Sequence, residues 1–323
     1  MAGKKGPGKA HRKGLSLVQA VRKFDNEQAA NDWFVGRRWP DGIECPYCDG
    51  SNVSPRKSKR LTPVYRCNPC KRDFTVKTGT IMHDSKLKLS TWAIALYLMS
   101  TNLKGVSSMK LHRDLGITQK AAWHLAHRIR ETYNDETVPF AGPVEVDESY
   151  VGGKERNKHA SKRLNAGRGP VGKAAVVGAK DRETNRVSAA PVEATDAPTL
   201  QEFVRERTEP TATVYTDEAR AYDGLPRLRQ AVKHSVGEYV DGMAHTNGIE
   251  SFWAMLKRGY QGTYHRLSEK HLARYVNEFA GRHNVRPHDT IDQMTIMARR
   301  GLDKRLTYEE LIGTPETRQP RMI

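Results

Sequence analysis

The amino-acid sequence predicts an α/β protein with a mixed sheet in its C-terminal half and two smaller segments before it. Three observations lead to this prediction. Short apolar strands alternate with amphipathic helices after Pro139, apolar residues recur at helical spacing from 85 to 132, and two cysteine pairs precede those helices. A chain of 323 residues is long enough for one large domain together with smaller ones.

Basic side chains strongly outnumber acidic ones. The chain has 54 Lys and Arg against 37 Asp and Glu, which gives a net charge of +17 at pH 7. This excess predicts a polyanionic partner, nucleic acid before an acidic membrane surface. No apolar run reaches about 18 residues and no apolar segment follows the basic start, so we expect no transmembrane span, no secretion signal and a cytoplasmic, nucleoid-associated protein. Residues 1–14 are expected to form a disordered basic tail.

Residues 15–84 are predicted to form two short helices and a zinc ribbon. The cysteines follow the pattern C-x2-C-x18-C-x2-C, and the residues around the second pair alternate like short hairpin strands. Four thiolates at this spacing suit a structural Zn²⁺ site, because each pair supplies two ligands from one tight turn. The ligands would be Cys45, Cys48, Cys67 and Cys70. Basic residues in this segment favour nucleic acid as its partner; a merely soluble basic surface is the alternative.

Residues 85–138 are predicted to form a small helical domain. An apolar helix ends near Gly105, and two further helices are separated by a turn at Gly116, with Thr118 capping the second. This is the layout of a helix-turn-helix. Its second helix would turn polar and aromatic side chains outward, and we expect DNA contacts from Lys120, Trp123, His127 and Arg130. An ordinary helical hairpin that packs on the next domain is the alternative.

Residues 139–284 are predicted to form the mixed sheet, and 285–323 a partly helical C-terminal tail. The expected strands cover 143–151, 173–180, 186–193, 211–216 and 232–239, with helices before the fourth strand, between the fourth and fifth, and after the fifth. Three antiparallel strands followed by strands reached through helices is the order of the RNase H-like fold. In that order the first and fourth strands are neighbours.

Three carboxylates from separate segments would meet on this sheet. Asp147 lies within the first strand, Asp217 ends the fourth, and Glu250 lies in the helix that follows the fifth. Such oxygen ligands suit a pair of Mg²⁺ or Mn²⁺ ions that drive phosphoryl transfer. Lys257 lies about two helical turns after Glu250 on the same face, where a cation could bind a phosphate.

Other residues compete for these roles. The rival acids are Glu145 and Glu148 beside Asp147, and Glu218 and Asp223 beside Asp217. Glu250 follows Asn247 by three residues, which is also the spacing of a capping box with Asn247 as N-cap. The basic loop after the first strand, with Lys154 and Lys158, either contacts phosphates beside the cleaved bond or is a solvated hairpin.

Several strings resemble one family of enzymes. They are VEVDESYVGGK, VYTDEARAY and HTNGIESFWAMLKRGY around the three acids, and RWPDGIECPYC and CNPCKRDFTVKTGTI around the cysteines. They resemble bacterial insertion-sequence transposases with an N-terminal zinc ribbon and a DDE core of the RNase H and retroviral integrase superfamily. The resemblance runs from about Leu17 to Asn284. It implies Asp147, Asp217 and Glu250 as the catalytic triad and Lys257 as the associated cation.

The resemblance also implies binding of double-stranded DNA at the terminal inverted repeats of a mobile element, followed by strand cleavage and strand transfer. A dimer or larger assembly is expected by analogy, because two element ends must be held together. Some relatives use Asn at the third acidic position, so Asn247 is the alternative to Glu250. We prefer Glu250, since a charged oxygen binds Mg²⁺ better than an amide.

Two other functions fit part of the sequence. A DNA-binding regulator with a zinc ribbon and a helix-turn-helix would account for the charge, the cysteines and the helices. It would leave the ordered acids of the sheet unexplained. An RNase H-like nuclease that cuts without joining would use the same acids, and an assay of joining separates it from a transposase.

Overall fold

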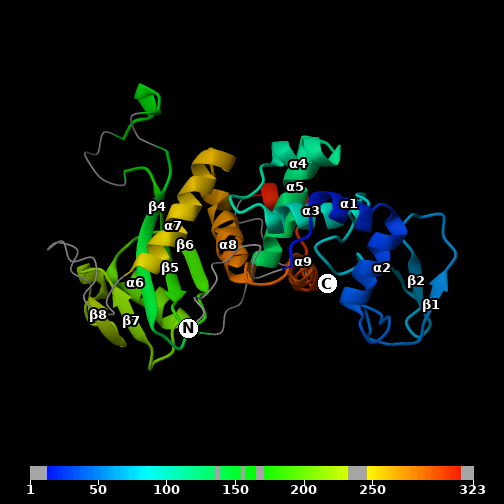
Figure 1. The fold of residues 1–323 in the computed structure, drawn as a ribbon, viewed down its shortest axis with the longest axis horizontal. Coiled ribbons are helices and arrows are strands. Elements are labelled where there is room, and N and C mark those ends of the chain that lie inside the picture. Colours follow the sequence, from blue (N-terminus) through cyan, green and yellow to red (C-terminus); the bar gives the residue numbers. More distant parts are fainter. Residues whose placement is uncertain (1–12, 135–138, 154–156, 165–170, 232–245, 314–323) are drawn as a thin grey trace. The chain divides into compact units, whose positions relative to one another are not determined.

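The computed structural model describes residues 13–134, 139–153, 157–164, 171–231 and 246–313 (Figure 1). The chain divides into two compact units. The first contains Met1–Tyr133 and Val285–Ile323, and the second contains Asn134–Asn284. Among the helices described, none combines the length and the apolar character that crossing a bilayer requires.

The first unit begins with two short helices and a ribbon. The helices are α1 (Leu17–Lys23) and α2 (Glu27–Arg38), capped by Ser16 and Asn26. The Asn26 side chain accepts from the backbone N–H of Ala29 at 2.8 Å, which satisfies one free donor of the first turn. Strands β1 (Val53–Arg56), β2 (Val64–Cys67) and β3 (Asp73–Phe74) form an antiparallel sheet with β2 in the centre.

The helical part of this unit contains α3 (Leu89–Thr101), α4 (Ser108–Leu115) and α5 (Gln119–Arg130). Helix α4 ends at Gly116, whose φ of 61° is left-handed and costs little without a Cβ atom. Thr118 caps α5 by accepting from the backbone N–H of Ala121 at 3.2 Å. The predicted turn at Gly116 and the predicted cap at Thr118 are therefore confirmed.

Residues 285–313, predicted as part of a C-terminal tail, complete this unit. They form α9 (Thr290–Arg300) and α10 (Tyr308–Ile312). Met294 and Met297 of α9 are buried in the same apolar cluster as Trp92 of α3 and Phe74 of the ribbon. One core thus includes the ribbon, the central helices and α9.

The second unit is built on a five-stranded mixed sheet. Its strands are β4 (Val144–Val151), β5 (Ala174–Asp181), β6 (Val187–Val192), β7 (Thr213–Thr216) and β8 (Leu228–Ala231). The spatial order is β6-β5-β4-β7-β8, with β4, β5 and β6 antiparallel and β4, β7 and β8 parallel. This is the RNase H-like order that the sequence predicts, with the first and fourth strands adjacent. The predicted strand at 232–239 lies outside the described residues, and the fifth strand seen is β8.

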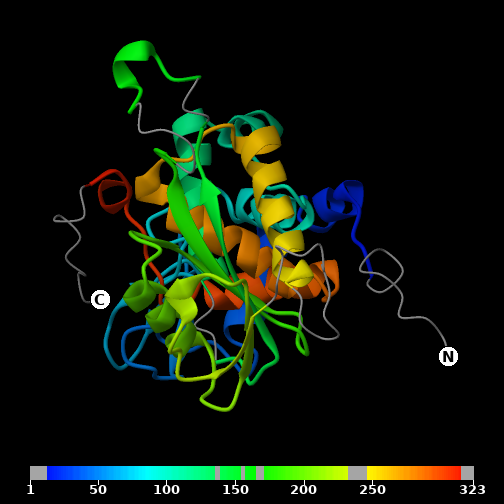
Figure 2. The same ribbon diagram turned by 90° about the vertical axis from the view of Figure 1, so that its left-hand side faces the viewer.

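Helices cover both faces of this sheet. Alternation along β4 directs Val144 and Val146 to one face, where they pack with α6 (Ala197–Arg207). The opposite face carries Val151 and packs with α7 (Asn247–Gly259) and α8 (Glu269–Val285). Figure 2 shows the sheet and α7 from the side. The residues of α7 are thereby brought over the middle of β4.

Candidate active site and zinc centre

The four cysteines of the ribbon form a compact cluster. Their Sγ atoms all lie within 4.8 Å of one another, with Cys45 and Cys70 3.6 Å apart and Cys48 and Cys67 3.6 Å apart. Tetrahedral zinc with Zn–S bonds of about 2.3 Å separates its sulfurs by roughly 3.8 Å. The cysteines therefore fit a zinc centre with four thiolate ligands. Because all four positions are taken by protein, the metal would be structural.

Some basic residues of the ribbon are engaged within the unit. Arg56 and Arg66 both pair with Asp73, at 3.0 Å for Arg66. The guanidinium of Arg72 lies over the ring of Tyr47 at 4.9 Å. The exposed cations that remain around the β1–β2 connection are Lys57, Lys59 and Arg60.

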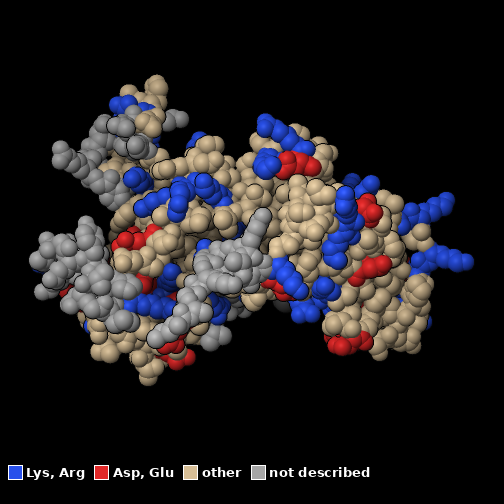
Figure 3. All heavy atoms as spheres, viewed as in Figure 1, with Lys and Arg blue, Asp and Glu red and all other residues tan. Residues whose placement is uncertain are grey.

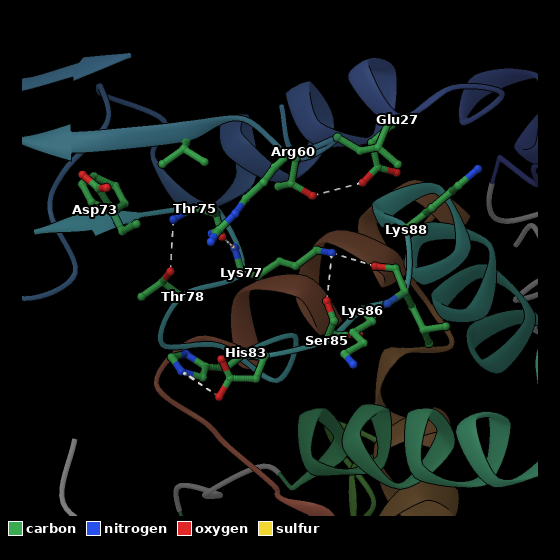
Figure 4. Close-up of a pocket in the computed structure, with 16 residues that line it drawn as sticks. Glu27, Arg60, Asp73, Thr75, Lys77, Thr78, His83, Ser85, Lys86 and Lys88 are labelled. Carbon is green, nitrogen blue, oxygen red and sulfur yellow. Dashed lines mark hydrogen bonds and ion pairs between the residues drawn. The ribbon is translucent and has the colours of Figure 1, made fainter. Parts of the chain in front are cut away.

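A cleft of about 710 Å³ lies between the ribbon and the segment that leads into α3 (Figure 4). Glu27 lines it and accepts hydrogen bonds from the backbone N–H groups of Leu89 at 2.9 Å and Ser90 at 3.3 Å. Its negative charge therefore stabilises the N-terminus of α3. Lys77 donates to the carbonyl oxygen of Leu87 at 2.6 Å, and burial lowers its pKa. The exposed cations lining the cleft are Arg60, Lys86 and Lys88.

The predicted outward face of α5 is only partly outward. Lys120 is exposed, but the expectation that His127 and Arg130 face solvent is wrong, since they are 0% and 2% exposed. Trp123 is half-buried, with its ring 6.2 Å from that of Tyr308 in α10. A single apolar stripe predicted one buried side, whereas α5 contacts α3, α4 and α10.

Asp147 lies in the middle of β4 beneath α7. Its Oδ2 accepts from Nε1 of Trp253 at 3.0 Å. Gly178 is its partner on β5, and a Cβ atom there would stand 2.7 Å from the Trp253 ring. The glycine thus makes room for the indole that holds the carboxylate.

The charges of the three predicted acids act on one another at this point. The pKa of Asp147 is raised to about 6, chiefly by burial and in smaller part by the negative charges of Asp217 and Glu250, against the hydrogen bonds that lower it. Asp217 follows β7, which pairs in parallel with β4. Its Oδ1 also accepts from the backbone N–H of Ala219 at 3.0 Å.

Glu148 joins this group of acids from the opposite side of β4. The hydroxyl of buried Tyr222 donates to its Oε1. Burial raises the pKa of Glu148 to about 7, with further contributions from Asp147 and Asp217. Among the other rivals, Glu218 is exposed, and Asp223 forms an ion pair with Arg229 at 2.6 Å. Glu148 was expected to compete with Asp147 for one role, and the structure has both acids in one charged cluster.

Glu145, two residues earlier, has a structural task. It is 1% exposed, accepts from Nε of Arg182 at 2.8 Å and from the backbone N–H of Ile249 at 2.8 Å. Lys180 adds a hydrogen bond to the carbonyl oxygen of Gly248 at 3.2 Å. These contacts fasten the first turn of α7 to β4 and β5, immediately before Glu250.

Glu250 is exposed in the first turn of α7, and its Oε1 accepts from Oγ1 of Thr246 at 3.1 Å. Thr246 is the N-cap and Asn247 the first helical residue, so the capping box with Asn247 as N-cap does not form. Lys257 is exposed near the end of the helix. Of the two predicted loop lysines, Lys154 lies outside the described residues, and Lys158 is half-buried.

Comparison with known proteins adds independent information. Residues 139–284 match the ISXO2-like transposase domain, and residues 25–73 match the transposase zinc-ribbon domain. An uncharacterized protein in transposable element ISH50 of Halobacterium salinarum is 30% identical over 283 residues, 83% of this chain and 94% of that protein. An uncharacterized transposase-like protein of Haemophilus influenzae is 32% identical over 89 residues, 27% of this chain and 71% of that protein.

Proposed function

The chain belongs to the transposases that carry a zinc ribbon before an ISXO2-like transposase domain, and we propose that it cuts the ends of an insertion sequence and joins them to target DNA. The observation that carries this proposal is that the elements bearing the three acids adjoin. Strand β7, which ends just before Asp217, pairs with β4, and Trp253 of the helix that carries Glu250 donates a hydrogen bond to Asp147. These acids come from β4, from the end of β7 and from α7, so only folding of the sheet brings their charges near one another.

The same acids would supply oxygen ligands to a divalent metal. Among the described residues only the four cysteines lie close enough together to hold an ion as they stand, so the three carboxylates would have to close around the metal. A half-buried carboxylate surrounded by like charges is held at a raised pKa, and a bound cation relieves that repulsion. Asp147, Asp217 and Glu250 would hold Mg²⁺ or Mn²⁺. Two such ions activate the attacking hydroxyl and stabilise the leaving oxygen in phosphoryl transfer. Lys257 would bind a phosphate of the DNA beside them.

The first unit would bind the terminal inverted repeats. Its contribution rests on the zinc ribbon, on exposed Arg60, Lys86 and Lys88 along the cleft of Figure 4, and on Lys120 at the start of α5. Phosphate contacts of this kind give affinity that falls steeply with salt. Two element ends must be held together, so the active species would be a dimer or larger.

The test is strand transfer of a pre-cut terminal repeat into plasmid DNA with Mg²⁺ or Mn²⁺. Asp147→Asn, Asp217→Asn and Glu250→Gln should each abolish transfer without abolishing DNA binding. Asp223→Asn is the matched control, because Asp223 is an exposed acid of the same segment that pairs with Arg229, and it should stay active.

Other outcomes would overturn parts of the proposal. Transfer by Asp147→Asn or Asp217→Asn would remove those residues from the triad. If Glu250→Gln were active and Asn247→Ala inactive, the third ligand would be Asn247. Cleavage without joining would favour the nuclease, and repeat binding without metal-dependent cleavage the regulator.

A further inference from the structure

A second cleft, of about 390 Å³, opens beside the acidic cluster of the second unit. One wall is the end of β4 together with the residue after it, from Glu148 to Gly152. The other walls are Lys173, which precedes β5, and the residues Lys257, Tyr260 and Gln261. Glu148 lines this cleft and also interacts with the charges of Asp147 and Asp217. Glu148 directly follows Asp147 in β4, so the acidic end of the cleft adjoins one of the acids that would hold the metal.

The charge of the cleft changes along its length. Glu148 marks its acidic end, whereas Lys173 and Lys257 supply two ammonium groups. Neither ammonium group has an ion-pair partner among the described residues. Gly152 brings Lys173 close to β4, since a Cβ atom at Gly152 would lie 3.0 Å from Cγ of Lys173. Figure 3 shows Lys and Arg side chains gathered over α7 on the face that it displays. An anionic chain that leaves a metal site would meet such cations next.

The wall that carries Tyr260 and Gln261 is a short π-helix, Tyr260–Tyr264, which follows α7 directly. The backbone N–H of His265 donates to the carbonyl oxygen of Tyr260 at 2.7 Å, five residues back. The Tyr264 hydroxyl donates to Glu278 of α8 at 2.9 Å, and Glu278 is 0% exposed. A hydrogen bond to a buried carboxylate therefore fixes the end of this turn. Such π turns often occur at functional sites.

We propose that this cleft binds the nucleotide adjacent to the scissile phosphate of the element end. Lys173 pairs with the phosphate of that nucleotide, and the half-buried ring of Tyr260 with the amide of Gln261 forms the wall against its sugar and base. This assignment rests on the proposed function, because it takes the acids beside the cleft to be the place where DNA is cut. It adds Lys173, Tyr260 and Gln261 to the DNA-binding surface.

The first experiment measures the affinity of the full chain for a DNA end in which single phosphates near the cut are replaced by uncharged methylphosphonates. With the natural DNA, Lys173→Ala should weaken binding roughly tenfold, as loss of one close phosphate contact does. Arg258→Ala is the matched control: Arg258 is exposed on α7 next to Lys257, does not line the cleft, and should change affinity less than twofold.

The position of the effect identifies the contact. One methylphosphonate next to the scissile bond should weaken binding to the wild-type chain by the same factor, and Lys173→Ala should then cause no further loss. The assignment would be overturned if, at every phosphate position tested, the methylphosphonate and Lys173→Ala each weakened binding and the two factors multiplied. Equal effects of Lys173→Ala and Arg258→Ala on affinity would also overturn it.

A second measurement does not depend on the stability of Lys173→Ala. Gln261→Cys should exchange with DNA that carries an activated disulfide tether on the flanking phosphate, releasing the leaving thiol of the tether and joining protein to DNA, and Arg258→Cys should not. Crosslinking by both variants or by neither would overturn the proposal. Both experiments measure binding and not cleavage. If the chain bound its DNA end but failed to cut it, the proposed function would be refuted, and these experiments would still test the cleft.

Discussion

Asp147 combines two stabilising hydrogen bonds with several unfavourable influences. The backbone N–H of Glu148 and the indole of Trp253 donate to it, while burial and two nearby negative charges oppose its ionisation. A carboxylate with this balance is poised to bind a cation, because the repulsion is relieved only when positive charge arrives. The residue is suited to its proposed task by its surroundings rather than by its own chemistry.

The raised pKa of Asp147 predicts how metal-free protein responds to pH. The pKa rises from its ordinary value of 3.8 to about 6, so in that window the folded state binds more protons than the unfolded state. The free energy of unfolding should therefore fall as pH rises through the window. Asp147→Asn should make the metal-free protein more stable at pH 8, by on the order of 2 kcal/mol, and change stability little at pH 4.

Denaturant unfolding at both pH values, with a chelator present, checks this. Added Mg²⁺ should restore stability to the wild-type chain at pH 8 and leave Asp147→Asn unaffected. An equal gain for Asp147→Asn at both pH values would show that packing, not charge, is responsible.

For single residues, the sequence predicted a role where a residue type was unusual for its position. An acid inside an apolar strand marked Asp147, and the order of elements pointed to Asp217 and Glu250 as its partners. The role of Glu145 could not be foreseen, because its partners Arg182 and Ile249 lie 37 and 104 residues away along the chain. Nothing in the local pattern distinguishes a carboxylate that binds a helix start from one that binds metal.

At the scale of elements, α7 depends on a close approach to the sheet. Its second residue, Gly248, has no room for a side chain, since a Cβ atom would lie 2.6 Å from Oε2 of Glu145 and 3.0 Å from Nζ of Lys180. The contacts that fasten the helix are therefore made possible by a glycine. Glu250 follows two residues later, so its position depends on the same contacts.

Gly248→Ala should therefore displace the first turn of α7. We expect the free energy of unfolding to fall by roughly 1–3 kcal/mol, the usual cost of overpacking. Strand transfer should fall more than DNA binding, because Glu250 moves. Gly262→Ala is the control, since a Cβ atom at Gly262 meets nothing within 4 Å. If the two variants had equal stability and activity, the close approach at Gly248 would have no consequence.

Helix α5 shows where periodicity stops being informative. Its apolar stripe was predicted and is buried, yet His127 and Arg130 on the expected outer side are buried as well. An apolar stripe indicates the most apolar face of a helix, but it does not predict that a second element covers another face. Helix α10 is such an element: it comes after the whole second unit in the sequence, and the ring of Tyr308 contacts α5.

At the scale of the molecule, the two units have separate apolar cores. The core of the first includes the zinc ligands Cys45 and Cys67, which are 1% and 0% exposed. Zinc removal should therefore raise amide hydrogen exchange in the ribbon and in neighbouring α2, and leave β4 and β5 unchanged. Cys45→Ser should reproduce this, and added zinc should rescue the chelated wild-type chain but not the variant. Faster exchange in β4 and β5 would mean that the units are not independent.

The C-terminal helix α9 gives the last test, because the sequence offered only a partly helical tail there. Met297 of α9 is 1% exposed and packs in the core with Trp92 and Phe34, so Met297→Ala should lower the free energy of unfolding of the first unit by about 2–5 kcal/mol. Met109→Ala on α4 is the matched control: Met109 is 44% exposed, and its loss should change stability by less than about 0.5 kcal/mol. Equal effects of the two substitutions would show that residues after 284 are dispensable to this core. A large effect confined to Met297 would mean that the first unit is completed only when residues that follow the five-stranded sheet of the second unit have been made.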